Sequence, residues 1–268
     1  MSAFRDVVRR AVRRLGVESS SVYLRLKGFY PHPSEIKRLA TMLASRGVTV
    51  VFDVGANVGQ FGKALRLAGY TGRIVSFEPL SDAHARLVNT AKGDRNWVVA
   101  PQMAIGDSDG SVEINIAGDS VSSSVLEMLD VHVAAAPDSA YVSREHVLAR
   151  RLDTVAGEYL SEGDVLFVKA DVQGCETQVL EGARELFPRI VGLHLELSLV
   201  PCYRGQVAFD RVMEALTLAG FSLWLLSPGT VDEQTGRQLQ VDTVFFRNEA
   251  CDSYNSAEWR FNTSEVLG

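Results

Sequence analysis

The sequence predicts an α/β domain built on a mostly parallel sheet with helices on both faces. From residue 49 onward, short apolar segments alternate with amphipathic ones, a pattern typical of strand–helix–strand units. The first apolar segment runs directly into an acidic residue and a glycine-containing turn, as expected at the ligand-binding edge of an open α/β sheet. A chain of 268 residues with 46% hydrophobic residues can bury one such core.

The elements follow in order along the chain. Strands are predicted near residues 49–54, 73–78, 97–100, 165–170, 190–197, 221–226 and 241–247. Helices are predicted near residues 58–68, 80–92, 174–186 and 206–219. Pro228-Gly229 and a polar stretch separate the last two strands, so we expect these strands to pair antiparallel at the sheet edge.

The domain is expected to span residues 49–250, between an N-terminal helical extension (1–48) and a C-terminal tail (251–268). Residues 4–15 have apolar side chains at helical spacing and five arginines on the remaining surface. This segment is expected either to pack on the domain or to contact an anionic membrane surface or a lipid-linked substrate. A second helix is predicted at about residues 34–46.

An insertion at about residues 105–155 interrupts the alternation. It contains a turn at 106–110, an alternating strand at 111–116, a serine cluster at 122–124 and a segment at 127–148 that we interpret as irregular. Long insertions in compact domains are often binding loops; a surface excursion without chemistry is the alternative.

Charge, hydropathy and cysteine content indicate which partners and which cellular location the protein is expected to have. The net charge of −6 does not favour a nucleic-acid partner. No apolar run approaches the roughly 18 residues of a membrane span, and no secretory signal is apparent. The three scattered cysteines, Cys175, Cys202 and Cys251, fit reduced thiols. We therefore expect a cytoplasmic protein, with membrane association on the cytoplasmic face as an option through residues 4–15; the oligomeric state is not predicted.

The most specific motif is the turn after the first strand. Gly55 and Gly59 let the backbone approach a ligand closely, while Asn57 stands where a dinucleotide fingerprint needs its second glycine. The acidic Asp53 suits a cationic ligand without phosphates, and S-adenosylmethionine is such a ligand. Glu78 ends the second strand about 20 residues later, where an acid binds ribose hydroxyls.

Taken together, several segments resemble the FkbM family of S-adenosylmethionine-dependent methyltransferases. The matching segments, in order, are VFDVGANVG (51–59), SFEP (76–79), the serines 122–124, RLDT (151–154), VKADVQGCE (168–176), VLEGA (179–183), LE (195–196) and DTVF (242–245). One departure is Gln173, where the family commonly has Glu. The resemblance implies the Rossmann-like class I methyltransferase fold, with seven strands of which the last is antiparallel, and O-methylation of hydroxyls on sugars or other secondary metabolites.

The cofactor residues follow from this reading. Asp53, Gly55, Asn57 and Gly59 are expected around the methionine moiety and the ribose, and Glu78 at the ribose hydroxyls. Ala104 is expected to flank the adenine. Ser123 and its neighbours are expected to contribute hydrogen bonds near the cofactor or the acceptor, unless they form an exposed turn.

Catalysis requires a group that takes a proton from the acceptor hydroxyl. Asp171 and Glu196, at the tips of the fourth and fifth core strands, are the candidates, and two hard oxygen donors would also suit Mg²⁺. His194 is a third candidate base. The alternative to a catalytic role is a structural one, in which Lys169 forms a buried salt bridge with Glu196 or Asp171. Tyr203 is expected either to line the substrate mouth or to pack as a loop aromatic.

The predicted function is O-methylation of a sugar hydroxyl on a small-molecule or lipid-linked acceptor: a glycolipid, a glycan or a glycosylated metabolite. Two other functions are compatible with the sequence. One is a non-catalytic protein that binds S-adenosylmethionine, and the other, disfavoured by Asn57, is a nicotinamide-dependent oxidoreductase.

Overall fold

The computed structural model describes residues 33–248. The predicted basic helix at residues 4–15 and the tail at 251–268 lie outside this range, so membrane contact through residues 4–15 stays a prediction. Within residues 33–248, no helix is long and apolar enough to cross a membrane.

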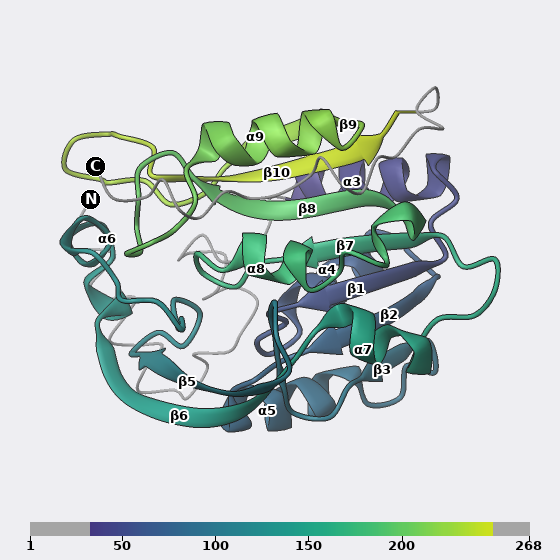
Figure 1. Cartoon of the computed structure of the whole chain (residues 1–268), viewed down its shortest axis with the longest axis horizontal. Coiled ribbons are helices and arrows are strands. Elements are labelled where there is room, and N and C mark those ends of the chain that lie inside the picture. Colours follow the sequence, from purple (N-terminus) through teal and green to yellow (C-terminus); the bar gives the residue numbers. More distant parts are fainter. Residues whose placement is uncertain (1–32, 249–268) are drawn as a thin grey trace.

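The core is one seven-stranded sheet (Figure 1). Its strands lie in the order β3 (Trp97–Val99), β2 (Arg73–Phe77), β1 (Val50–Val54), β7 (Leu166–Ala170), β8 (Ile190–Ser198), β10 (Gln240–Arg247) and β9 (Phe221–Pro228). Neighbouring strands pair parallel from β3 to β8, whereas β10 is antiparallel to both β8 and β9. The predicted class I fold is thereby confirmed, including the antiparallel last strand and the hairpin at the sheet edge.

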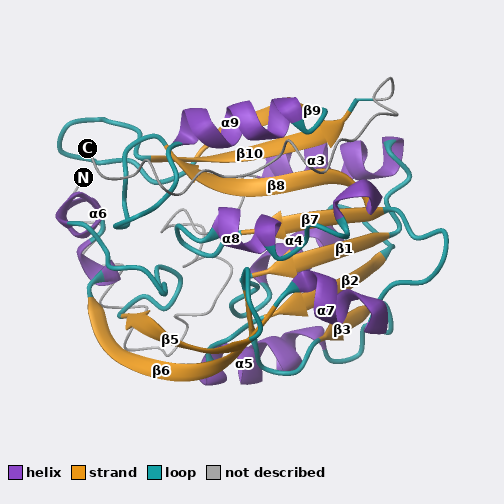
Figure 2. Ribbon diagram, viewed as in Figure 1, coloured by secondary structure: helices purple, strands orange, loops and turns teal. Residues whose placement is uncertain are grey.

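Helices cover both faces of this sheet (Figure 2). On one face, α3 (Pro33–Ser45), α4 (Gln60–Leu67) and α5 (Ser81–Ala91) bury Leu43, Leu65 and Leu87 against the strands. On the other face, α7 (Leu152–Val155), α8 (Glu176–Glu181) and α9 (Phe209–Leu218) pack in a second apolar cluster. The strands alternate between the two clusters, as the side-chain period of a sheet covered on both faces requires.

The helix predicted at residues 174–186 is shorter than expected. α8 ends at Glu181, and a Cβ atom at Gly182 would lie 1.9 Å from the carbonyl oxygen of Gly106. Beyond this contact, Asp153 accepts hydrogen bonds from the backbone N–H groups of Glu185 and Leu186. Tertiary hydrogen bonds therefore replace the helical ones that the sequence pattern suggested.

The insertion folds as a second sheet. β5 (Gly110–Ala117) pairs antiparallel with β6 (Tyr141–Arg150), and the short β4 (Ala104–Ile105) pairs parallel with β6. The two long strands form a curved ribbon beside the main sheet (Figure 1). The interpretation of residues 127–148 as irregular is wrong: they contain α6 (Asp130–Ala135), a 3₁₀ turn (Pro137–Ser139) and most of β6.

Candidate functional site

The site lies at the carboxyl ends of β1 and β7, where the chain crosses to β2 on one side and to β8 on the other. In open α/β sheets this is the topological switch point at which ligands bind. Gly55 has a φ of 72°, and a Cβ atom there would lie 2.0 Å from the carbonyl oxygen of Asp171. Only glycine permits this backbone approach.

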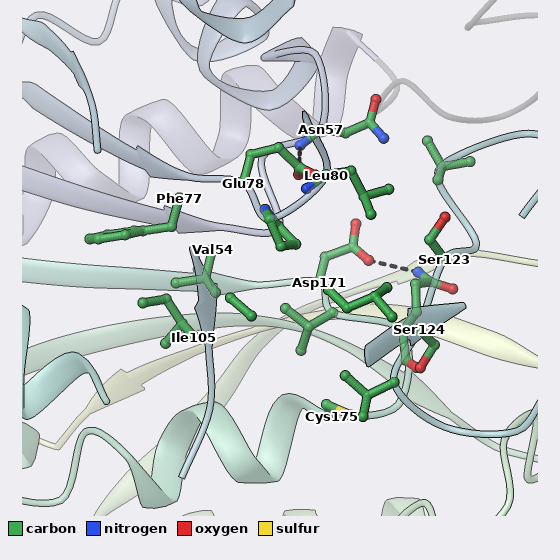
Figure 3. A pocket seen from close by; sticks show the side chains of 18 of the residues that line it. Val54, Asn57, Phe77, Glu78, Leu80, Ile105, Ser123, Ser124, Asp171 and Cys175 are labelled. Atoms are coloured by element: carbon green, nitrogen blue, oxygen red, sulfur yellow. Dashed lines mark hydrogen bonds between the residues drawn. The ribbon is translucent and has the colours of Figure 1, made fainter. Parts of the chain in front are cut away.

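A pocket enclosing about 710 Å³ of space continuous with solvent opens at this edge. Of the seven predicted cofactor residues, five line the pocket: Gly55, Asn57, Glu78, Ala104 and Ser123. Figure 3 shows Glu78, Leu80 and Asn57 at one end, Cys175 and Ser124 at the other, and Asp171 between them.

Glu78 is fixed at one end of this pocket. One carboxylate oxygen accepts a hydrogen bond from the backbone N–H of Asn57 at 2.7 Å, and the other accepts one from the N–H of Leu80 at 2.9 Å (Figure 3). Burial raises the pKa of Glu78 to about 7, although these two hydrogen bonds oppose the shift. Each oxygen retains a lone pair for a further donor, so the carboxylate can bind the hydroxyl groups of a ligand.

The insertion supplies another wall of the pocket. Ser120, Val121 and residues 123–125 line it, and the side-chain amide of Asn57 lies 3.4 Å from the Ser120 hydroxyl. The Ser123 hydroxyl accepts from the N–H of Ala117 and donates to the carbonyl of Ser120. This hydroxyl therefore stabilises the loop that forms the wall.

Two predicted cofactor residues lie behind the pocket wall. A Cβ atom at Gly59, which has a φ of 86°, would lie 2.9 Å from Leu87, so this glycine allows close packing of α5. Asp53 is fully buried and accepts a hydrogen bond from the Ser76 hydroxyl at 3.2 Å. Neither residue lines the pocket, so any influence of Asp53 on the cofactor is exerted through the turn.

The buried cation beneath the turn is Lys169. Its Nζ lies 3.3 Å from Asp53 and 3.8 Å from Asp171, and it donates to the carbonyl oxygens of Val54 and Gly55. Burial alone would lower the pKa of Lys169, but the carboxylates of Asp53 and Asp171 outweigh burial and raise it. Lys169 thus pairs with Asp171, as the structural alternative predicted, but its shorter pairing is with Asp53.

Asp171 and Glu196 are brought together by a residue to which the sequence analysis assigned no role. The side-chain amide nitrogen of Gln173 lies 2.7 Å from Asp171 Oδ1 and 2.6 Å from Glu196 Oε2. The Asp171 side chain is 39% exposed and lines the pocket. Glu196 is only partly exposed, and burial, followed by the charge of Asp171, raises the pKa of its carboxyl well above its usual value.

These two carboxylates do not form a metal site as they stand. The space between them is occupied by the N–H₂ group of Gln173, a donor that cannot coordinate a cation. Among residues 33–248, no group of three His, Cys, Asp or Glu side chains is arranged to hold a metal ion. The residues present therefore do not fit Mg²⁺ in this geometry.

The remaining candidates lie outside the pocket wall. His194 contacts Asp242 at 3.1 Å through Nε2, and its ring packs against Phe61. Its place in the interior of β8, two residues before Glu196, puts it behind the strand tip. Tyr203 is fully buried, and its hydroxyl donates to Gln173 Oε1 at 2.7 Å, so it supports the site from within.

Two features of Gln173 signal its importance, but only in the folded chain. It has a φ of 54°, which is uncommon for a residue other than glycine, and it is 8% exposed despite its polar side chain. Sequence gives a single hint, because Gln173 precedes Gly174 directly after a strand tip. Such a pair marks a turn but does not identify what the side chain binds.

Comparison with known proteins places this site in context. A family model described as the methyltransferase FkbM domain matches residues 53–223. A comparison with curated proteins gives no significant match.

Solved structures with a similar arrangement include three methyltransferases. A magnesium protoporphyrin IX methyltransferase from Synechocystis with bound S-adenosylmethionine is 12% identical, with a TM-score of 0.44 over 81% of this chain and 80% of that one. An O-methyltransferase from Bacillus cereus in complex with S-adenosylhomocysteine is 13% identical, with a TM-score of 0.44 over 81% and 82%. An rRNA methylase from Streptococcus thermophilus is 12% identical, with a TM-score of 0.41 over 81% and 97%. At such low identity and similarity, no argument about substrate rests on these structures.

Proposed function

Because this chain belongs to the FkbM family of S-adenosylmethionine-dependent methyltransferases, we propose that it transfers a methyl group to a hydroxyl oxygen. The acceptor we propose is a sugar hydroxyl of a glycolipid, a glycan or a glycosylated metabolite. The observation that carries the proposal is a single pocket holding both a fixed carboxylate, Glu78, and a half-exposed one, Asp171.

The side chains and backbone groups that line the pocket suit the chemistry of the cofactor. The Glu78 carboxylate, held by two backbone N–H groups, is suited to accept hydrogen bonds from the ribose hydroxyls. Apolar side chains of Leu80, Ala104 and Ile105 line the same pocket and suit the adenine ring. The turn at Gly55 approaches without a side chain, and Asp171 provides negative charge on the side where a cationic sulfonium would lie.

When bound, the cofactor supplies a methyl group for in-line displacement, in which the sulfur–carbon bond breaks as the oxygen–carbon bond forms. The protein must hold the acceptor oxygen about 3 Å from the methyl carbon and exclude water. Asp171 is the residue we assign as proton acceptor, because it is the carboxylate of the pair that lines the pocket. Glu196 lies behind it, linked through Gln173, and we assign it to orienting Asp171.

A hydroxyl acceptor agrees with this arrangement. Carboxylates accept hydrogen bonds from hydroxyl groups, whereas a phosphorylated reacting end would meet the like charge of Asp171, the carboxylate of the pair that lines the pocket. We therefore propose that the reacting end of the acceptor is an uncharged polyol such as a sugar ring. Magnesium has no step in this proposal, since the amide of Gln173 occupies the space between the carboxylates.

Two substitutions test the catalytic assignment. Asp171→Asn should reduce methyl transfer at least about 100-fold, the usual contribution of general-base catalysis. Glu196→Gln should also reduce it, because Glu196 orients Asp171 through Gln173, and S-adenosylhomocysteine should still bind to both variants. Glu162→Gln, at an exposed position, is the control for a lost carboxylate. The assay is calorimetric titration with S-adenosylhomocysteine, with NAD as a control ligand, followed by an acceptor screen starting with deoxysugar glycolipids.

The outcomes separate the competing functions. Normal turnover in both variants would refute the roles of Asp171 and Glu196. Binding of S-adenosylhomocysteine without transfer to any hydroxylated acceptor would favour a non-catalytic binding protein. Saturable binding of NAD in its place would favour an oxidoreductase and refute the cofactor assignment.

A further inference from the structure

Gln173 stands at the junction of three parts of the molecule. Its side-chain nitrogen contacts the carboxylates of Asp171, after β7, and Glu196, in β8. Its side-chain oxygen accepts from Tyr203, in the segment after β8. Its backbone carbonyl accepts from the Ser124 hydroxyl of the insertion at 2.7 Å. The residue therefore connects the loop that lines the pocket to the two carboxylates.

Tyr203 fixes which end of the amide faces the carboxylates. Because the tyrosine hydroxyl donates to Oε1 at 2.7 Å, the N–H₂ group must point toward Asp171 and Glu196. The reversed amide would set a carbonyl oxygen against two carboxylates, an arrangement without a donor. A Cβ atom at Gly174 would lie 3.0 Å from the Tyr203 ring, so the ring is packed directly against this turn.

Asp171 Oδ1 and Glu196 Oε2 both lie within hydrogen-bond distance of the side-chain nitrogen of Gln173. The separation of these two oxygens therefore cannot exceed the sum of the two hydrogen-bond distances. At such a separation in a partly buried site, one carboxyl group of a pair takes up a proton unless donors compensate the repulsion. The amide of Gln173 provides one N–H for each carboxylate. Gln240 adds a third donor, to Glu196 Oε2 at 3.0 Å, and does not contact Asp171.

We propose, building on the proposed function, that Gln173 is a positioning residue whose side-chain amide holds Asp171 and Glu196 in one geometry. One N–H directs Asp171 into the pocket, and the other keeps Glu196 beside it. The bond from Ser124 ties this arrangement to the insertion, so the carboxylates and the pocket loop are set together.

The charged and titratable groups that face this pair come from several elements. The groups are Lys169 beside Asp171, Glu176 at the start of α8, Asp242 and its partner His194 on β10 and β8, and Tyr203 and Cys202 after β8. None of these groups is itself removed by a substitution at Gln173, so we compare each variant with the wild type at the same pH. Glu78 and Glu176 also have raised pKa values, both about 7. Their contribution to the pH dependence of stability is common to the variants and the wild type, so it is subtracted in the comparison.

The test is the pH dependence of thermal stability in Gln173→Leu and Gln173→Glu. Loss of the amide removes a hydrogen bond that opposes the raised pKa of Glu196, so this pKa rises further, and the stability conferred by a raised carboxyl pKa is lost as pH rises through that pKa. Both variants should therefore unfold below the wild-type Tm by a margin that grows from pH 5 to pH 8, reaching about 5 °C at pH 8. Gln234→Glu, at an exposed position, adds the same charge and should follow the wild type.

If the variants unfold below the wild-type Tm by the same margin at pH 5 and pH 8, the substitutions remove only packing, and the proposal is overturned. Should Gln173→Glu fail to fold at pH 5, Tyr203→Phe gives the same comparison, because it removes the hydroxyl that orients the amide. S-adenosylhomocysteine titration of the wild type and of Gln173→Leu accompanies the series. Failure of the wild type to bind would refute the proposed function, whereas the pH comparison reports on Gln173 independently.

Discussion

Replacing Lys169 by methionine should be among the most damaging single changes in the core. Its Nζ lies 3.3 Å from Asp53, which corresponds to about 5 kcal/mol of attraction at an effective dielectric constant of about 20. Removing one partner of a buried pair leaves the other charge uncompensated, at a cost of about 3–5 kcal/mol. Because the same ammonium donates to the carbonyl of Gly55 at 2.9 Å, cofactor affinity should also fall, by about tenfold if 1.4 kcal/mol of turn positioning is lost.

The assay is urea unfolding combined with S-adenosylhomocysteine titration. Lys63→Met, at an exposed position of α4, is the matched control and should change neither property. Asp53→Asn added to Lys169→Met should restore at least about 1 kcal/mol, since it removes the unpaired charge and directly contacting pairs couple at this scale. A loss below about 1 kcal/mol in Lys169→Met, with unchanged affinity, would refute the idea that this ion pair supports the turn.

Two further substitutions probe the pocket itself. Gly55→Ala should cost more than about 2 kcal/mol and abolish S-adenosylhomocysteine binding, because the added Cβ would lie 2.0 Å from the Asp171 carbonyl oxygen; near-normal binding in calorimetry would contradict this. Glu78 has a pKa raised to about 7 by burial, so wild-type affinity for S-adenosylhomocysteine should fall between pH 8 and pH 6 as the carboxylate is protonated. In Glu78→Gln the affinity should be lower and independent of pH over that range, and an unchanged pH dependence would assign it to another group.

The positions of the core strands and the turn after the first strand were predictable because they rest on local patterns. Each core strand is a short apolar run that ends in a turn, and Gly55 and Glu78 stand at the ends of the first two strands. β6 was missed because one of its faces is open to solvent. Arg144 and His146 are exposed, whereas Glu145 is half-buried and Val147 is buried, so a charged residue on the inner face obscures the alternation.

The internal partners of the site were less accessible to sequence reasoning. Lys169 and Asp53 are opposite each other in the register of β7 and β1, a relation that depends on strand order and not on spacing along the chain. The amide of Gln173 reaches Glu196 across the gap between two strand ends, and its orientation depends on Tyr203. Such contacts arise only when segments distant in sequence come together.

The position of the insertion limits how acceptor preference can be exchanged between related proteins. Ser120, Val121 and Val125 belong to the segment connecting β5 to α6, yet they form a wall of the pocket that holds Glu78. A chimera that imports residues 110–150 from a relative would replace part of the proposed nucleoside-binding surface along with the rest of the insertion. Recombination boundaries that retain Ile114 and residues 118–126 would leave the part of the pocket lining contributed by residues 110–150 intact and confine the exchange to the outer ribbon.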